Sequence, residues 1–296
     1  MEKRTLGRTG LEVSALGFGG AEIGFQNASL ATVERLLGSA LDADLTIIDT
    51  AECYAGSEEL IGRAVGHRRS QFHLFTKCGH ASGLPYDDWD PQLLRESINR
   101  SLIRLGTDCV DLVQLHSCGE DKLRQGDVIA VLLEAQEAGK TRFIGYSGDR
   151  EAARYAVKCG AFDTLQTSVN IADQQPLSLS LPLALEKNVG VIAKRPLANA
   201  AWMRTDVPAD DYSHPYWTRL RALGYDFLAG TDAASVALRF TLAQPAVATA
   251  IVGTQNPERW LQNAQMLEAG PLPAGQREAI QSRWQAAASA DWVGQQ

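Results

Sequence analysis

The chain has 296 residues, of which 45% are hydrophobic and 21% charged, and its formal net charge at pH 7 is −7. This composition is typical of a folded protein with a large buried core and argues against extended disorder. The acidic balance offers no basic groove for nucleic acid and no polybasic patch for a lipid surface, so we expect neither partner.

The cysteines and the N-terminal residues bear on the cellular compartment that we expect for this protein. The number of cysteines is odd and no pair has CxxC spacing, which argues against a zinc site or a redox pair. Residues 1–6 open with charges instead of an apolar leader, and no run of about 18 apolar residues follows. We therefore expect a cytoplasmic protein. Its free thiols would be Cys53, Cys78, Cys109, Cys118 and Cys159.

Eight short runs of strand-forming residues recur along the chain. Most are continuously apolar instead of alternating, as expected for parallel strands that are covered on both faces. They lie at residues 14–18, 45–49, 72–77, 110–115, 143–147, 164–168, 189–193 and 248–252.

Helical patterns separate these runs. Apolar residues spaced three and four apart predict helices over 30–41 and 128–138, and Gly139 is placed to end the second helix. Eightfold strand–helix alternation predicts an α/β fold of the (β/α)8 TIM-barrel type. Such barrels reach this length as one domain, so we expect residues 1–296 to form a single domain. The glycine-rich segment 16–20 lacks the third glycine that a doubly wound dinucleotide fold would need.

Two segments depart from the regular repeat, at residues 78–90 and 198–230. Loops that follow barrel strands lie on the C-terminal face, where active sites form, so both are candidate substrate walls. Alternatively, their aromatic side chains pack the insertions onto the barrel. The aromatic candidates for the substrate pocket are Trp89, Trp202, Tyr216 and Trp217.

Four side chains with proton chemistry lie at or just after successive predicted strands. Asp49 ends the second run, and Tyr54 lies in the loop that follows it. Lys77 ends the third run and His116 directly follows the fourth. Each alone could be structural, as a capping aspartate, a snorkelling lysine or a satisfied core histidine. Together, at neighbouring strand ends of a barrel, they predict a catalytic site.

These four groups suit proton transfer to or from a carbonyl oxygen. A phenol is a weak acid unless a cation stabilises the phenolate, which Lys77 can supply. Asp49 can hold that lysine charged and oriented, and neutral His116 can donate a hydrogen bond to the carbonyl oxygen. No histidine-rich or paired-carboxylate spacing indicates a metal site.

The same residues carry a family resemblance. Residues 48–58 read Ile-Asp-Thr-Ala-Glu-Cys-Tyr-Ala-Gly-Ser-Glu and resemble the signature of the aldo-keto reductases. Residues 75–77 and 111–116 are similar to the family's lysine and histidine segments, and residues 6–19 to its N-terminal hairpin and first strand. The resemblance implies a (β/α)8 barrel with NADP(H) across its mouth. It also implies that Tyr54 is the general acid in reduction and the general base in oxidation of a small carbonyl or alcohol substrate.

The resemblance further implies contacts to the nicotinamide carboxamide. Residues 145–148 resemble a Gly-x-Ser-Asn segment, in which Ser147 keeps its place and Gly148 replaces the asparagine. Gln166 and Asn170 resemble a Gln-x-x-x-Asn pair, with Gln166 as the carboxamide partner.

After the seventh predicted strand the family places an aromatic ring against the nicotinamide, and here Lys194 occupies that position. The cofactor-binding residues implied there are Lys194, Arg195, Pro196 and Leu197. Two alternatives remain open: a side chain of Lys194 or Arg195 covers the nicotinamide, or both reach the pyrophosphate.

The last strand-to-helix junction resembles the family's adenosine-phosphate segment and includes Gly253 and Thr254. Within it, Arg259 offers a planar fork to a 2′-phosphate, and Gln262 and Asn263 would meet the adenine. Gly253 replaces a familiar lysine, so we expect NADP(H) as the cofactor with NAD(H) as a secondary one.

Two other functions fit the same residues. An aldo-keto barrel can serve as a redox-sensing, non-catalytic subunit of a larger assembly. A TIM-barrel lyase or isomerase could instead use Lys77 to form a Schiff base.

Overall fold

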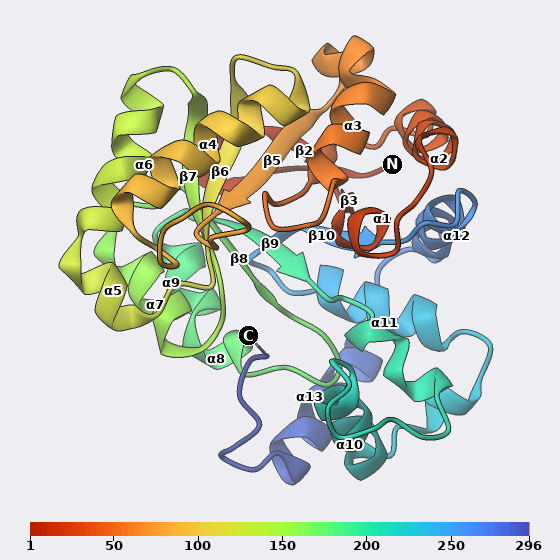
Figure 1. Ribbon diagram of the computed structural model, residues 1–296. Coiled ribbons are helices and arrows are strands. Elements are labelled where there is room, and N and C mark those ends of the chain that lie inside the picture. The colour runs from red at the N-terminus through yellow and green to blue at the C-terminus, as the bar shows by residue number, and fades with distance from the viewer. Residues whose placement is uncertain (296) are drawn as a thin grey trace.

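Eight parallel strands close into a barrel in the computed structural model, which describes residues 1–295 (Figure 1). Neighbouring strands follow chain order, and the ring closes where the last strand pairs with the first. The (β/α)8 barrel predicted from the sequence is therefore confirmed. The barrel strands are β3 (Leu16–Gly19), β4 (Ile47–Asp49), β5 (His73–Cys78), β6 (Val110–His116), β7 (Thr141–Ser147), β8 (Thr164–Ser168), β9 (Gly190–Lys194) and β10 (Val247–Gly253).

The first barrel strand begins later than the sequence predicts. Ser14 belongs to an N-terminal hairpin formed by β1 (Lys3–Thr5) and β2 (Glu12–Ser14). Its amide donates to Thr46 Oγ1 at 2.6 Å, and its hydroxyl accepts from the Thr46 amide at 3.0 Å. These side-chain bonds end the hairpin strand before β3 begins at Leu16. Apolar side chains of the hairpin pack in one cluster with barrel-strand residues, among them Ile47 and Ala248 near the strand starts, so the hairpin closes the N-terminal end of the barrel.

Helices surround the barrel, and local sequence signals set their ends. The α2 helix begins after Ser29, whose side chain accepts from the Thr32 amide, and it buries an apolar stripe. Gly139 follows α6 with a φ of +72°, as expected of a glycine that ends a helix. The helices are α1 (Ala21–Phe25), α2 (Leu30–Asp42), α3 (Ser57–Val65), α4 (Pro91–Leu105), α5 (Glu120–Gln125), α6 (Asp127–Glu137), α7 (Arg150–Cys159), α8 (Pro176–Leu179), α9 (Leu181–Glu186), α10 (His214–Leu223), α11 (Ala233–Leu242), α12 (Arg259–Met266) and α13 (Ala274–Ala287). Short 3₁₀ helices are η1 (Gly7–Thr9), η2 (Gly66–Gln71), η3 (Ala198–Met203), η4 (Asp226–Ala229) and η5 (Leu267–Ala269).

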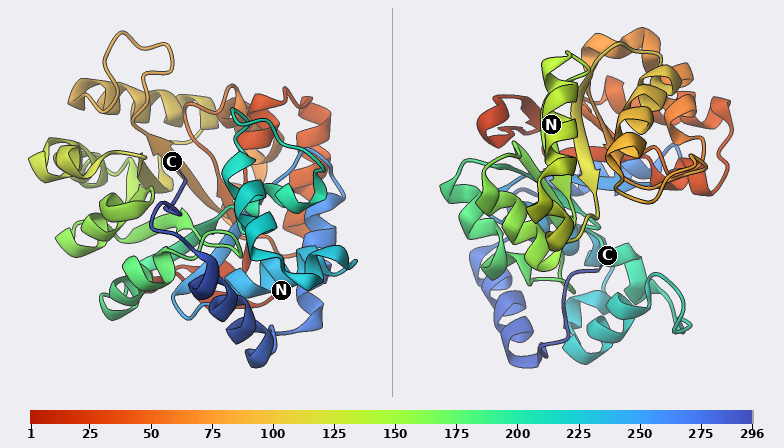
Figure 2. Two further views of the ribbon diagram at one scale, coloured as in Figure 1. Left: turned by 90° about the horizontal axis from the view of Figure 1, so that it is seen from below. Right: turned by 60° about the vertical axis from the view of Figure 1, so that its left-hand side comes forward.

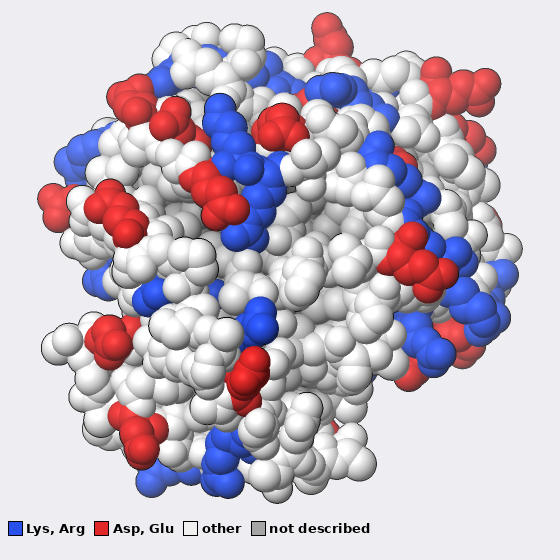
Figure 3. All heavy atoms as spheres, turned by 180° about the vertical axis from the view of Figure 1, so that it is seen from behind, with Lys and Arg blue, Asp and Glu red and all other residues white. Residues whose placement is uncertain are grey.

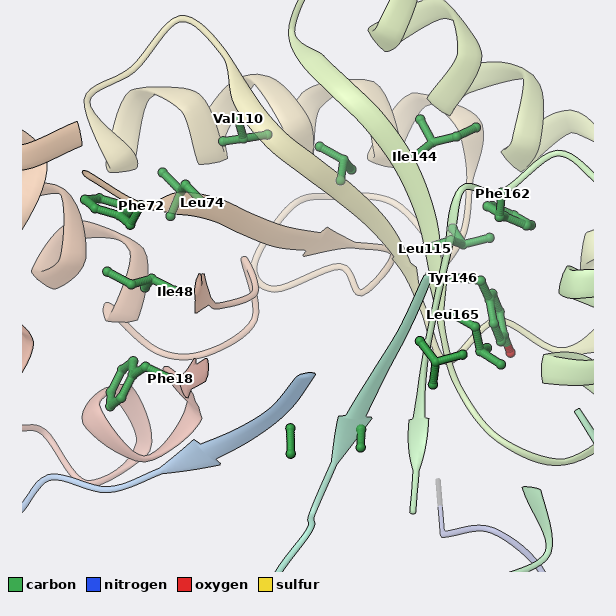
Figure 4. Packing of buried hydrophobic residues seen from close by; sticks show 14 of the residues in the cluster. Phe18, Ile48, Phe72, Leu74, Val110, Leu115, Ile144, Tyr146, Phe162 and Leu165 are labelled. Carbon is green, nitrogen blue, oxygen red and sulfur yellow. The ribbon is translucent and has the colours of Figure 1, made fainter. Parts of the chain in front are cut away.

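The main hydrophobic core lies between the strands and the surrounding helices. Alternate strand residues divide between two regions: Ile48 faces the helices with Val110 and Ile144 (Figure 4), whereas Ile47 packs with Phe75 in the cluster beneath the barrel mouth. Because strand side chains alternate between faces, each strand contributes to both regions. This packing fixes the positions of the C-terminal strand ends, which carry the polar side chains at the mouth of the barrel.

A second core cluster joins α10, α11 and α13 outside the barrel. Helices α10 and α13 lie side by side (Figure 2), and buried Tyr216 and Leu220 of α10 pack in the same cluster as Ile280 of α13. The irregular segment 198–230 therefore packs through its apolar residues against α11 and α13.

Acidic and basic side chains are interspersed on the face seen in Figure 3. Among residues 1–295, none of the helices combines the length and the apolar character needed to span a membrane. All five cysteines are free thiols, as predicted.

Candidate active site

The barrel brings the four predicted catalytic side chains together at the C-terminal ends of its strands. Asp49 is the last residue of β4, and its Oδ2 lies 2.5 Å from Lys77 Nζ of β5. Lys77 Nζ lies 4.9 Å from the centre of the Tyr54 ring. The rings of Tyr54 and His116, which ends β6, lie 5.8 Å apart and meet edge to face. We refer to Asp49, Tyr54, Lys77 and His116 as the tetrad.

Asp49 is the centre of a buried hydrogen-bond network. Its Oδ1 accepts from the side-chain amides of Gln114 and Gln166, each at 2.9 Å. Lys77 Nζ also donates to the Thr50 carbonyl at 2.7 Å, and the side chains of Asp49 and Lys77 are each 1% exposed. With this many partners, the carboxylate and the ammonium have fixed positions.

Electrostatics keep Lys77 charged. Burial alone would lower the pKa of Lys77, but attraction to the Asp49 carboxylate and their hydrogen bond raise it above its usual value. The lysine is therefore an ammonium at neutral pH and sits beside the Tyr54 ring as a permanent cation. A charged amine is not nucleophilic, which argues against the Schiff-base alternative.

Tyr54 and His116 are both uncharged at neutral pH. Burial raises the pKa of Tyr54, and the Lys77 ammonium opposes that rise. Burial, together with the positive charge of Lys77, lowers the pKa of His116 well below its usual value. The site thus combines a protonated phenol, a neutral imidazole and a fixed cation, which can protonate an oxygen and stabilise the phenolate left behind.

Sequence reasoning missed several side chains that border the tetrad. Gln114 lies two residues before His116 on the same face of β6, and that spacing was the available signal. Cys53 Sγ lies 3.6 Å from His116 Nδ1, and burial raises the pKa of this thiol to about 12, so it remains unreactive. His80 lies 4.9 Å from His116, measured between ring centres.

The residues predicted to face the carboxamide lie on neighbouring strands. Ser147 pairs with His116 across β6 and β7, and with Gln166 across β7 and β8. The Ser147 hydroxyl donates to Gln166 Oε1 at 3.0 Å. The Tyr146 side chain explains why position 148 is a glycine, because a Cβ at Gly148 would lie 2.4 Å from the Tyr146 hydroxyl oxygen. An asparagine does not fit there without moving Tyr146.

The end of β9 and the residue that follows it hold two half-buried cations against one carboxylate. Lys194 Nζ and Arg195 Nη1 lie 2.9 and 3.6 Å from Asp149 Oδ2. Burial lowers the pKa of Lys194 to about 8, although Asp149 opposes this shift. Asp149 also accepts from the Ser168 amide at 2.8 Å. Asp149 was not predicted, although it directly follows Gly148.

The backbone of this segment is unusual, which suits a ligand-binding loop. Arg195, Ala198, Asn199 and Ala200 all have left-handed φ values between +44° and +55°. The Asn199 side-chain nitrogen is buried and has no hydrogen-bond partner within residues 1–295. Two cations and an unpaired buried donor match the needs of a phosphate-bearing cofactor. Pro196 is buried here and Leu197 is half-buried.

The residues that the resemblance assigns to the adenosine phosphate divide into buried and exposed positions around the start of α12. Thr254 and Asn263 are buried, whereas Gly253 and Gln262 are exposed. Arg259 is the exposed first residue of α12, so its side chain is free to meet an anion near that helix end.

The four aromatic candidates have different surroundings. Trp89 lies at the mouth, where its Nε1 donates to the His116 carbonyl at 2.8 Å. Trp202 and Trp217 are partly buried against the second core cluster, and Tyr216 is fully buried within it. The Tyr216 hydroxyl donates to Asp173 Oδ2 at 3.1 Å. This position fits the packing role for Tyr216.

Known proteins resemble this chain over most of its length. The model of the aldo/keto reductase family matches residues 15–285. The L-galactose dehydrogenase of Arabidopsis thaliana is 31% identical over 86% of this chain and 84% of its own length. The NADH-specific methylglyoxal reductase of Escherichia coli is 29% identical over 67% of this chain and 68% of its own. The holo form of an aldo-keto reductase from Bacillus halodurans superposes with a TM-score of 0.82 at 29% identity, covering 99% of both chains.

Proposed function

Because the chain belongs to the aldo/keto reductase family and is an oxidoreductase, we propose that it interconverts an aldehyde or ketone with the corresponding alcohol, using NADP(H). The observation that carries this proposal is the tetrad. Lys77 is held by Asp49 at 2.5 Å and lies 4.9 Å from the ring of Tyr54, which shares the mouth with neutral His116.

In reduction, the substrate oxygen would sit between Tyr54 and His116. His116 donates a hydrogen bond to that oxygen and orients the carbonyl. When bound, the nicotinamide supplies the hydride that adds to the carbonyl carbon. Tyr54 gives its proton to the oxygen, and Lys77 stabilises the phenolate until solvent returns the proton. In oxidation, the same tyrosine accepts the proton of the alcohol.

The cofactor would lie along the β7 to β10 side of the mouth. Ser147 and Gln166 would bind the carboxamide, Lys194 and Arg195 would face either the nicotinamide or the pyrophosphate, and Arg259 would read the 2′-phosphate. Relatives differ in the cofactor that their names state, since the Escherichia coli protein is called NADH-specific. Arg259 favours NADP(H) here, with NAD(H) as a secondary cofactor.

The decisive experiment is an NADPH-consumption assay over a panel of aldehydes and ketones. Tyr54→Phe removes only the acidic hydroxyl, so turnover should fall by roughly 10²- to 10⁴-fold while NADPH affinity stays nearly constant. Tyr155→Phe, a half-buried tyrosine on α7 that contacts Arg124, is the matched control and should leave turnover unchanged. Near-normal turnover in Tyr54→Phe would sink the proposal. Tight NADPH binding with no turnover of any substrate would favour the redox-sensing alternative instead.

A further inference from the structure

His80 lies beside the tetrad in a position that several hydrogen bonds hold. It lies in the loop between β5 and α4, and its ring centre is 4.9 Å from that of His116. Its side chain is 30% exposed, so the ring borders the open mouth instead of the core. Neither the proton chemistry nor the cofactor contacts proposed above use this side chain.

The loop that carries His80 is closed on itself and fastened to β6. The Trp89 amide donates to the Gly79 carbonyl at 2.7 Å, and the Trp89 indole donates to the His116 carbonyl at 2.8 Å. Gly79 permits this closure, because its φ is +145° and a Cβ there would lie 2.9 Å from the indole. The His80 amide also donates to buried Glu52 at 3.2 Å. His80 therefore keeps a defined place relative to the tetrad.

Asp88 contacts Nδ1 of His80 and so leaves Nε2 as the ring nitrogen for a ligand. Asp88 Oδ2 lies 2.9 Å from His80 Nδ1, and Asp88 Oδ1 accepts from the Ala81 amide at 2.8 Å. These two hydrogen bonds outweigh the effect of burial and lower the pKa of Asp88, so its carboxylate is ionised and accepts the Nδ1 proton. In the neutral imidazole, Nε2 then carries a lone pair and can accept a hydrogen bond.

The surrounding charge favours a hydroxyl over an anion as the group that Nε2 meets. The Asp88 carboxylate contacts the His80 ring, whereas Glu52 accepts from the His80 main-chain amide and is paired with Arg100 at 3.3 Å. A substrate carboxylate or phosphate at Nε2 would lie close to the ionised carboxylate of Asp88. A hydroxyl can donate its proton to Nε2 without that penalty.

The spacing suits two oxygens on adjacent carbons. In a 2-hydroxy carbonyl compound the two oxygens lie roughly one hydrogen-bond length apart, about 2.8 Å. Rings whose centres are 4.9 Å apart can therefore each bind one of them. His116 Nδ1 is directed to Cys53 at 3.6 Å, which leaves its other nitrogen for the reacting oxygen.

We propose that His80, positioned by Asp88, recognises a hydroxyl on the carbon next to the reacting carbonyl, so that the enzyme prefers 2-hydroxyaldehydes and 2-hydroxyketones, or vicinal diols in the reverse direction. The proposal rests on the proposed carbonyl-reductase function and names its substrate class. His80 is the specificity residue, and Asp88 is a positioning residue that acts through it.

The test compares two aldehydes that differ by one hydroxyl, 2-hydroxypropanal and propanal, with NADPH as the reductant. One net hydrogen bond predicts a kcat/KM about tenfold higher for 2-hydroxypropanal in the wild type. His80→Phe keeps a ring in place but cannot accept the bond, so this preference should vanish while kcat/KM for propanal changes less than about twofold. His80→Gln restores an acceptor and should recover part of the preference.

Asp88→Asn tests the positioning role against a matched control. It should reduce the hydroxyl preference, because an asparagine can donate to Nδ1 and turn Nε2 into a donor. Asp87→Asn removes the same charge from an exposed neighbour whose side chain forms no hydrogen bond with His80 within residues 1–295, and it should leave the preference intact.

Other outcomes separate the two proposals. A wild type that reduces both aldehydes equally, with turnover dependent on Tyr54, overturns the inference and leaves the proposed function standing. Equal losses for both aldehydes in His80→Phe and His80→Gln would mean that His80 only supports the loop. Absence of turnover with every carbonyl overturns both proposals.

Discussion

Replacing Asp49 with asparagine should damage the site far more than the loss of one charge suggests. Oδ2 accepts from the Lys77 ammonium and Oδ1 from the amides of Gln114 and Gln166, so every neighbour of this carboxylate is a donor. An asparagine must direct its own NH2 group either at the ammonium or at the two amides. Either orientation places donor against donor in a site that is 1% exposed.

The magnitude follows from the burial of the pair. Breaking a buried ion pair by removing one partner costs about 3 to 5 kcal/mol of unfolding free energy, because the remaining charge is left uncompensated. We expect that cost for Asp49→Asn and a similar one for Lys77→Met. The double variant leaves neither charge of this pair buried. Its loss of unfolding free energy should therefore be smaller than the sum of the losses in the two single variants, by about 2 kcal/mol or more.

Urea unfolding of the wild type, the two single variants and the double variant measures the coupling free energy between Asp49 and Lys77. The control is Glu59→Gln, which removes a carboxylate that is 44% exposed and paired with Arg104 at 2.9 Å. An exposed pair is worth less than about 1 kcal/mol, so this variant should remain close to the wild type. Additive costs for Asp49→Asn and Lys77→Met would refute the reasoning. In kinetics, Asp49→Asn should lower turnover through Lys77 while NADPH affinity is kept.

Three further predictions concern cofactor choice, pH and stability. Arg259→Ala should weaken NADPH by about 1.5 to 3 kcal/mol and NADH hardly at all, and equal weakening in binding titrations would show that Arg259 does not read the phosphate. Because the pKa of Lys194 is about 8, its protonated fraction falls from about nine-tenths at pH 7 to about one-tenth at pH 9, so NADPH affinity should fall over this interval. Lys194→Met should make NADPH affinity nearly independent of pH over this interval. If the same substitution leaves the ratio of the NADP⁺ and NADPH dissociation constants unchanged, Lys194 contacts the phosphates and not the nicotinamide. Asp111 pairs with Arg69 and Arg142 at 2.7 Å, and although burial opposes ionisation, its hydrogen bonds hold the pKa of Asp111 well below its usual value. This stabilisation is complete above the unfolded-state pKa near 4 and is lost as the pH falls below it, so unfolding free energy should drop between pH 5 and 3 in the wild type and less in Asp111→Asn.

Most of the barrel was predictable because its strands carry a local signal. Continuous apolar runs mark strands that are buried on both faces, and polar residues at their ends marked Asp49 and Lys77. The hairpin boundary was misplaced at Ser14, because the reciprocal bonds with Thr46 join residues that are distant in sequence. Such contacts leave no periodic pattern in the chain.

The polar partners of the tetrad were harder to predict for the same reason. Gln114 and Gln166 reach Asp49 from strands that only the closed barrel brings together. His80 was hidden because its role depends on a loop closure between Gly79 and Trp89, which requires a left-handed glycine and an indole packed against it. Loop geometry of this kind is set by tertiary contacts and not by local preference.

The charges at the mouth fall into two groups, of which only one is neutral, and this division bears on how the site would hold an anion. Lys77 is neutralised by Asp49 on the β4 to β6 side, where the proton chemistry is proposed. Lys194 and Arg195 share the carboxylate of Asp149 on the other side. A phosphate that approaches Lys194 must therefore compete with Asp149, which is itself held by the Ser168 amide and cannot turn away without losing that bond. Because two cations share one carboxylate, one positive charge remains uncompensated on this side, whereas the pair of Lys77 and Asp49 carries no net charge.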